Sequence, residues 1–293
     1  MTIYDVRSVI NTADQLGETP LWCERTQKLW WLDIERPKLQ SLDPLTGAYQ
    51  AFPFDCVFAG SLALCATGGF LIALDNNLHR FTPETGELKL FAEVEPATPN
   101  TRLNDGRTDR QGRFWVGTVD NKFKEPLGSL YRVDPSGQVT RFMEGIICSN
   151  TLAFSPDGRT MYFSDTRGYV TWAFDLDPKT GDVSNRRIFA DYRADNSRPD
   201  GACVDADGFL WNAIFGGHRI IRYAPDGRVD RVIELPVSNP TCLCFGGRDF
   251  ATLYVTTATK MIAPDVLAKE THAGAVLALD VGVRGMAESR FDI

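Results

Sequence analysis

The chain of 293 residues is 43% hydrophobic and 24% charged, with a formal net charge of −7 and a pI near 5.1. This composition suits a protein with a sizeable apolar core, and its acidic balance argues against nucleic acid or an anionic membrane as a partner. No apolar run could span a bilayer, and the N-terminus has no basic segment followed by an apolar one, so we expect a cytoplasmic protein without a membrane partner. The seven cysteines, with no C-x-x-C pair, favour free buried thiols in a reducing compartment.

The predicted strands follow one phrase that recurs along the chain. Each copy has an apolar strand, a tight turn and a second strand rich in β-branched and aromatic residues. The copies cover, in chain order, residues 23–34, 63–74, 108–119, 154–166, 204–215 and 244–257. A second hairpin follows each copy, with turns such as D-P-x-x-G and P-D-G in which proline sets φ and glycine supplies a positive φ. After the sixth copy this hairpin is degenerate, at residues 273–285.

The period of the phrase predicts the fold. From Gly69 to Gly247 the turn glycines recur every 39 to 50 residues, and six copies of about four strands match a β-propeller. We therefore predict an all-β, six-bladed β-propeller that forms one domain over residues 1–293. The N-terminal stretch IYDVRSVI supplies one extra strand and the last copy is one strand short, so pairing of the N- and C-terminal strands is expected to close the ring.

Each innermost strand is expected to begin with an oxygen-bearing side chain. Counting back eight residues from the turn glycine finds Ser61, Asn104, Asn150 and Asp200, and Glu18 occupies about the same place in the first copy. The sixth copy offers Asn239 or Thr241 at this position. Because inner strand ends line the central channel of a propeller, these side chains are predicted to converge on its axis. Asp205 and Asp207, by contrast, are predicted to belong to a turn.

Three members of this ring could hold a metal ion. Glu18, Asn150 and Asp200 offer two carboxylates and an amide oxygen. Two carboxylates crowded in a channel repel each other unless a cation joins them, and an all-oxygen set suits Ca²⁺, Mg²⁺ or Mn²⁺ better than a structural Zn²⁺. The alternative is that the polar strand ends bind only channel water.

Arg102 lies two residues before Asn104, so both side chains point to the same face of a strand. A guanidinium beside an amide is suited to holding the oxygens of a polar substrate. The alternative for Arg102 is a salt bridge across the channel mouth to Glu18 or Asp200. Asp105 is expected to bond to backbone, as Asx residues before glycine commonly do.

Five stretches resemble the senescence-marker-protein/gluconolactonase/regucalcin family of sugar lactonases. They are GETPLW (17–22), RLNDGRTDRQGRFWVGT (102–118), SNTLAFSPDGRTMYFSDT (149–166), RPDGACVDADGFLW (198–211) and CFGGRDFATLYVTTA (244–258). The resemblance implies a six-bladed propeller that hydrolyses sugar lactones with one divalent metal at its axis, which polarises the carbonyl. It implies that Glu18, Asn150 and Asp200 are metal ligands and that Asp200 is also the general base. It further implies that Arg102 and Asn104 bind the substrate.

Two departures from the family pattern bear on the substrate. The loop at residues 119–129 is shorter than in the animal proteins and has no matching acidic contact, so Asp120 and Asn121, with Ser61 of the ring, are candidate substrate-binding residues. Thr151 follows Asn150 where many members have glycine.

The sequence therefore predicts a monomeric lactonase with calcium as the first choice of metal and Mg, Mn, Zn or Fe as alternatives. Its predicted partner is a small sugar lactone. A nucleophilic serine mechanism is not indicated, because there is no G-x-S-x-G elbow and none of the three histidines begins an inner strand. Two other functions remain open: a broader esterase or organophosphate hydrolase, and a non-catalytic calcium-binding propeller.

Overall fold

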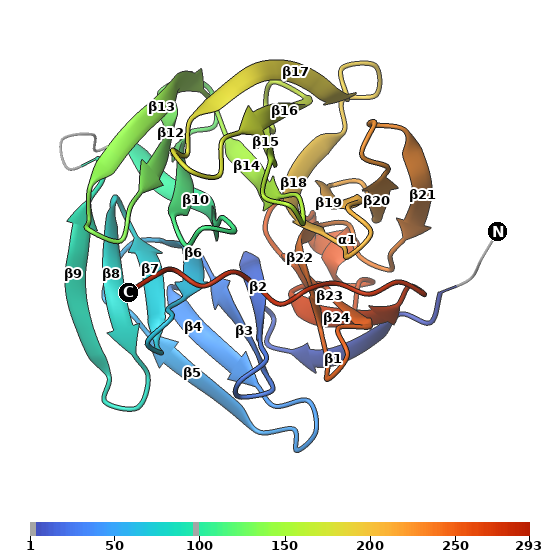
Figure 1. Ribbon diagram of the computed structural model, residues 1–293. Helices are drawn as coiled ribbons and strands as arrows, with labels where there is room; N and C mark the ends of the chain where they lie inside the picture. The colour runs from blue at the N-terminus through green and yellow to red at the C-terminus, as the bar shows by residue number, and fades with distance from the viewer. Residues whose placement is uncertain (1–3, 96–99) are drawn as a thin grey trace.

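The computed structural model describes residues 4–95 and 100–293 and consists of six four-stranded sheets arranged around a central axis (Figure 1). The first sheet contains β2 (Gly17–Cys23), β3 (Lys28–Asp33), β4 (Lys38–Leu42) and β5 (Tyr49–Pro53). The second contains β6 (Ala59–Leu64), β7 (Phe70–Leu74), β8 (Asn77–Thr82) and β9 (Glu87–Glu93). The third contains β10 (Thr101–Thr108), β11 (Phe114–Asp120), β12 (Gly128–Val133) and β13 (Val139–Ile146).

The second half of the ring continues this pattern. The fourth sheet contains β14 (Ser149–Phe154), β15 (Thr160–Asp165), β16 (Val170–Leu176) and β17 (Val183–Asp191). The fifth contains β18 (Arg198–Val204), β19 (Leu210–Phe215), β20 (Arg219–Tyr223) and β21 (Val229–Glu234). The sixth contains β22 (Pro240–Gly246), β23 (Thr252–Thr257), β24 (Ala275–Asp280) and β1 (Arg7–Asn11). Neighbouring strands within these sheets pair antiparallel.

The sixth sheet joins the two ends of the chain. Its order is β1-β24-β23-β22, and β1 pairs antiparallel with β24, with Arg7 opposite Ala278. The predicted all-β, six-bladed propeller closed by its terminal strands is therefore confirmed. Because β1 supplies the fourth strand of the sixth sheet, the sheet that holds both ends of the chain is complete. Within the described residues, no helix is long and apolar enough to cross a membrane; α1 (Pro264–Leu267) is a single turn between β23 and β24.

In the third and fifth blades, the turn between the first and second strands is held by an aspartate, Asp109 or Asp205. In the fifth blade the Asp205 carboxylate accepts the backbone N–H groups of Asp207 and Phe209, both at 3.0 Å. It also accepts the indole N–H of Trp211 at 2.9 Å and pairs with Arg222 at 2.7 Å. Asp205 and Asp207 thus belong to the turn, as predicted. Because these contacts fix the turn, they also fix where β18 ends and where β19 begins.

All six innermost strands break their regular pairing near the start of the strand. Register shifts separate Glu18 from Leu21, Leu103 from Gly106, Asn150 from Ala153, and the equivalent pairs in β6, β18 and β22. A bulge bends a strand and changes the direction of the side chains beside it. These bulges therefore determine how the polar ring residues meet the axis.

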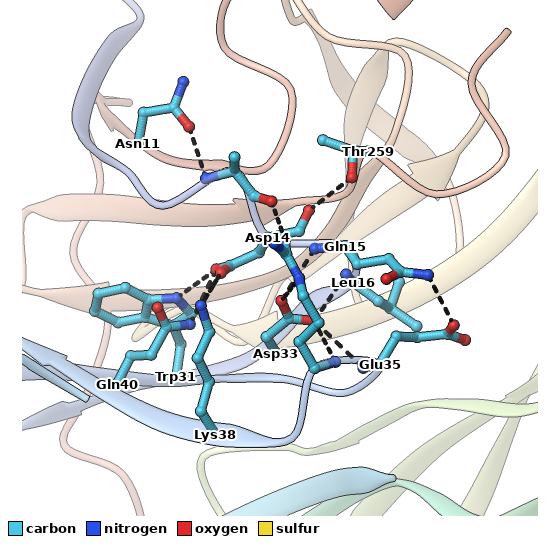
Figure 2. A network of polar contacts seen from close by, with 12 residues as sticks. Asn11, Asp14, Gln15, Leu16, Trp31, Asp33, Glu35, Lys38, Gln40 and Thr259 are labelled. Atoms are coloured by element: carbon cyan, nitrogen blue, oxygen red, sulfur yellow. Dashed lines mark hydrogen bonds and ion pairs between the residues drawn. The ribbon is translucent and has the colours of Figure 1, made fainter. Parts of the chain in front are cut away.

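A network of buried polar groups joins the sixth blade to the first (Figure 2). Asp14 accepts the indole N–H of Trp31 at 2.8 Å and pairs with Lys38 at 3.1 Å, while its backbone carbonyl accepts the N–H of Thr259 at 3.1 Å. The Asp33 carboxylate accepts the N–H groups of Gln15 and Leu16 at 3.0 and 3.1 Å. The network fixes the segment that leads into β2, and with it the position of Glu18.

The C-terminal segment, residues 281–293, crosses the middle of the ring and ends beside β7 (Figure 1). Its backbone bonds to the turns that follow four innermost strands, through Leu64, Ala66, Thr67, Gly112, Ala206 and Phe250. The Phe291 side chain is fully buried against Phe91 and Phe114. Because these turns lie where the inner strands end, the segment covers the end of the channel opposite the strand starts.

Candidate functional site

One cavity opens at the end of the axis where the inner strands begin. Five predicted residues from four blades line it: Glu18 of β2, Arg102 and Asn104 of β10, Asn150 of β14 and Asp200 of β18. All five are buried. Residues as far apart in sequence as Glu18 and Asp200 therefore meet, as the repeat register predicted. A concave site with apolar walls and several convergent polar side chains suits a small molecule.

A chain of hydrogen bonds orients the amides of the cavity. Arg102 Nη1 donates to Asn104 Oδ1 at 2.7 Å, and Asn104 Nδ2 donates to Asn150 Oδ1 at 3.3 Å. Asn150 Nδ2 in turn donates to Thr166 Oγ1 at 2.8 Å. The guanidinium of Arg102 lies 4.8 Å from the centre of the Phe58 ring. Within the described residues Arg102 forms no ion pair, so the salt bridge to Glu18 or Asp200 is not formed.

The backbone of Asp200 is held from two sides. Its carbonyl accepts the hydroxyl of Thr151 at 2.6 Å and the amide N–H of Asn212 at 3.0 Å. Thr151 has a φ of +61°, a left-handed conformation that is strained for a β-branched residue. The threonine at this position therefore gives Asp200 a hydrogen bond that glycine could not supply.

The two carboxylates of the cavity repel each other. Burial and the charge of Asp105 raise the pKa of Glu18 to about 8. Burial, followed by the charges of Glu18 and Asp105, raises the pKa of Asp200 well above its usual range. Neither Glu18 nor Asp200 has an ion-pair partner among residues 4–95 and 100–293. Asp105 accepts the N–H of Leu152 at 2.8 Å, as expected for a backbone-binding Asx residue.

This donor set fits a hard divalent cation. Two buried carboxylates whose pKa values are raised by burial and by neighbouring negative charge are stabilised when a positive ion joins them, and Asn150 adds a neutral oxygen. In the part of the chain that the structure describes, no cluster of three His, Cys, Asp or Glu side chains is arranged for a metal. The third protein donor of such a site would therefore be an amide.

Ser61, Asp120 and Asn121 are not among the residues that line the cavity. The Asp120 carboxylate accepts the backbone N–H groups of Lys122, Lys124 and Glu125 at 3.2, 2.9 and 2.9 Å, so it is occupied by its own loop. The N–H of Asn121 donates to the carbonyl of Asn100 at 2.9 Å. Ser61 is fully buried beside Gly106. The structure thus places these three candidates outside the lining of this cavity.

Replacing Asp120 by alanine is expected to loosen residues 121–127. The loop would lose three backbone N–H···O bonds to the Asp120 carboxylate, and the amides that made them would then exchange with water. Trypsin should cut after the exposed Lys122 and Lys124 several-fold faster than in the parent, as read by mass spectrometry of limited digests. Asp226→Ala, at an exposed turn, is the control. Equal cleavage rates in all three proteins would contradict this role for Asp120.

The cavity wall also contains residues that the sequence analysis did not predict. Arg198 lies two residues before Asp200, as Arg102 lies two before Asn104, and the same spacing places Leu16 and Cys148 in the wall. This spacing would have identified Arg198. The remaining wall includes side chains from loops outside the repeat, for which the repeat register carries no signal: Phe123, Arg167, Lys260 and Met261.

The fold and the site together define a class of protein: six-bladed β-propellers with carboxylate and amide side chains in an axial cavity. A family model described as "SMP-30/Gluconolactonase/LRE-like region" matches residues 16–259. The 6-deoxy-6-sulfogluconolactonase of Pseudomonas putida is 36% identical over 287 residues, which cover 98% of each chain. The L-arabinolactonase of Azospirillum brasilense is 36% identical over 284 residues, covering 96% of this chain and 93% of the relative. A solved structure, a calcium-binding protein, regucalcin, from Agrobacterium tumefaciens, has a TM-score of 0.95 at 32% identity and covers 100% of both chains.

The chain belongs to the SMP-30/gluconolactonase/LRE-like family. The family predicted from the motifs is therefore confirmed, and so is the class of enzyme, because two relatives that cover nearly the whole chain are lactonases.

Proposed function

We propose that this protein hydrolyses the ester bond of a sugar lactone to the aldonic acid, with a divalent cation held by Glu18, Asn150 and Asp200. The observation that carries the proposal is the convergence of these residues with Arg102 and Asn104 on one buried cavity. When bound, a divalent cation polarises the ester carbonyl as a Lewis acid. Calcium is the first choice, because the donors are all oxygens and the solved relative carries the description calcium-binding. Mg, Mn, Zn and Fe are the alternatives.

In this proposal Asp200 is the general base. Its carboxylate takes a proton from the water whose oxygen attacks the carbonyl carbon, and it returns that proton to the ring oxygen when the C–O bond breaks. The hydrogen bonds from Thr151 and Asn212 to its backbone support this role, because a base must be held within hydrogen-bond reach of the water.

Arg102 and Asn104 are proposed to bind and orient the lactone. Arg102 is charged at any pH at which the enzyme works and is buried in the wall, and its bond to Asn104 Oδ1 fixes both side chains in one arrangement. Arg102 presents its free N–H groups to the hydroxyl and ring oxygens of a sugar, and Asn104 lies beside it in the wall with its own amide donating to Ser149 O at 2.9 Å and Asn150 Oδ1 at 3.3 Å. Orientation of this kind lowers the entropic part of the barrier.

Removing metal should abolish activity and lower thermal stability together. The protein would be treated with chelator, supplied in turn with Ca²⁺, Mg²⁺, Mn²⁺, Fe²⁺ or Zn²⁺, and assayed by proton release from glucono-, galactono-, xylono- and arabinonolactone. At a cation concentration of about 100 times Kd, mass action adds about 2.7 kcal/mol to the free energy of unfolding, so Tm should rise by several degrees.

The stability readout is independent of the substrate. Glu18→Gln removes one of the two repelling carboxylates, so it should raise the Tm of the metal-free protein and reduce the shift on adding cation. A chelated protein that hydrolyses lactones at the full rate would overturn the metal-dependent proposal. A folded, cation-stabilised protein that is inert toward every lactone would favour the calcium-binding alternative, and faster turnover of phosphotriesters would favour the organophosphate hydrolase.

A further inference from the structure

The axial cavity is much more basic than the protein around it. The chain carries a net charge of −7, yet its cavity is lined by four cationic side chains: Arg102, Arg167, Arg198 and Lys260. The only carboxylates in the described wall are Glu18 and Asp200. These are the proposed ligands of the divalent cation, so in the loaded enzyme they would not neutralise the three arginines of the wall.

The cavity arginines lack the partners that other buried arginines have. Outside the cavity, each buried arginine pairs with a carboxylate: Arg107 with Glu288 at 2.8 Å, Arg113 with Asp109 at 2.7 Å and Arg222 with Asp205 at 2.7 Å. Among residues 4–95 and 100–293, Arg102, Arg167 and Arg198 form no ion pair. Because a desolvated cation is costly unless it is paired, Arg102 stands out among the buried arginines; half-buried arginines outside the cavity, such as Arg80 and Arg110, also form no ion pair within the described residues.

Arg198 and Arg167 both line the cavity from half-buried positions. Arg198 is the first residue of β18 and lies two residues before Asp200, so both side chains share a face of the strand. Arg167 lies two residues after the end of β15, and its guanidinium carbon lies 6.0 Å from the centre of the Phe123 ring. Neither guanidinium donates a hydrogen bond to a side-chain acceptor within the described residues. Both therefore have N–H donors available to a ligand.

Lys260 adds charge but is held in place. Its ammonium contacts Glu35, which also accepts the amide of Gln15 at 3.2 Å (Figure 2), and it lies 5.1 Å from the centre of the Phe123 ring. Its backbone N–H donates to the Gln15 carbonyl at 3.0 Å, and its own carbonyl accepts the amide of Asn239 at 2.7 Å. The charge of Lys260 is thus compensated by Glu35, whereas the two arginines supply unpaired charge and free donors.

We propose that the substrate is an anionic sugar lactone, whose carboxylate or sulfonate substituent, remote from the reacting carbonyl, is bound by Arg198 and Arg167. The inference rests on the proposed lactonase function and deepens it by naming the substrate class. A guanidinium fork matches a carboxylate in a bidentate pair and also suits the three oxygens of a sulfonate. The positive cavity would in addition raise the encounter rate of an anion with an otherwise acidic protein.

The test compares lactones of one configuration that differ at a single carbon. D-Glucono-1,4-lactone carries a neutral hydroxymethyl group, D-glucaro-1,4-lactone a carboxylate and the 1,4-lactone of 6-deoxy-6-sulfogluconic acid a sulfonate. In the metal-loaded enzyme at low salt, kcat/KM for at least one charged lactone should exceed that for the neutral lactone by about tenfold or more, chiefly through KM. The preference should shrink as NaCl is raised, because salt screens the charges. The larger of the two ratios identifies the anion.

Two variants assign the preference to residues. Arg198→Met and Arg167→Met should each lower the charged-to-neutral ratio of kcat/KM by about tenfold, and Arg198→Lys should retain part of it. Arg228→Met removes the same charge from an exposed turn and should leave the ratio unchanged. Tm reports whether each variant is folded.

The failures of the two proposals are distinguishable. If the neutral lactone is hydrolysed but neither charged lactone is preferred, or if the ratio stays within twofold in both methionine variants, the anionic-substrate inference is wrong while the lactonase stands. If a folded, metal-loaded protein hydrolyses none of the three lactones, the lactonase proposal fails and this inference fails with it.

Discussion

Asp200→Asn is expected to lower kcat/KM for the preferred lactone by about 10³-fold, within the range of 10² to 10⁴ that a general base supplies. The substitution keeps the size of the side chain and the backbone contacts to Thr151 and Asn212, so the fold should persist. It also removes one of two repelling buried carboxylates, so the metal-free variant should be at least as stable as the parent. Proton release measures the rate, and thermal unfolding measures the stability.

A matched control lies on the adjoining turn. Asp207→Asn makes the same change at an exposed side chain, with only a 3.6 Å approach to Arg222, and should leave kcat/KM within twofold of the parent. The cation-induced rise in Tm separates the two roles of Asp200. A variant that is inactive but still stabilised by cation has lost the base, whereas one that no longer responds has lost a ligand. Full turnover in Asp200→Asn would contradict the assignment of the base.

Glu288→Ala should lower the free energy of unfolding by about 3–5 kcal/mol, the usual cost of leaving a buried ion alone after its partner is removed. Glu288 lies on the C-terminal segment, residues 281–293, and pairs with Arg107 of β10 at 2.8 Å, with side chains 12% and 9% exposed. At the same end of the channel, Arg110 donates to Ser289 Oγ at 3.1 Å. Without Glu288, the guanidinium of Arg107 would remain in the channel with its charge uncompensated.

Urea unfolding of a double-mutant cycle would measure this pair. Replacing both partners, as Arg107→Met with Glu288→Leu, should recover most of the loss, because an apolar pair of similar volume avoids the unpaired charge. Glu144→Ala breaks an exposed pair with Arg141, with side chains 63% and 55% exposed, and should cost less than about 1 kcal/mol. A loss in Glu288→Ala as small as in this control would mean that the ion pair does not hold the C-terminal segment.

The architecture was predictable because it is repeated. Turn glycines such as Gly158 and Gly208, with φ of +68° and +87°, recur at blade spacing and mark every innermost strand. From that register the positions of Asn104, Asn150 and Asp200 on the axis follow by counting. Where one strand is hard to recognise in the sequence, the spacing of the other copies still fixes its position.

The candidates that came from loop position alone were placed elsewhere by the fold. Asp120 ends β11 as Asp33 ends β3 and Asp165 ends β15, and in each of the three the carboxylate accepts backbone N–H groups. An acidic residue beside a loop can bind a substrate or accept hydrogen bonds from its own backbone, and the amino-acid sequence does not distinguish these two roles. The direction of the side chain in the folded protein distinguishes them.

The sequence by itself determined the number of blades, the closure by β1 and β24, and the identity of the polar residues on the axis, because each depends on a period that is written in the chain. The tertiary structure decided what no period encodes. The contacts of Phe123, Arg167 and Lys260 join loops far apart in sequence, the bulges in the inner strands direct side chains such as Asp200, and the C-terminal segment seals the far end through Glu288. These features arise from packing between elements distant in the chain, where a residue's surroundings rather than its type set its role.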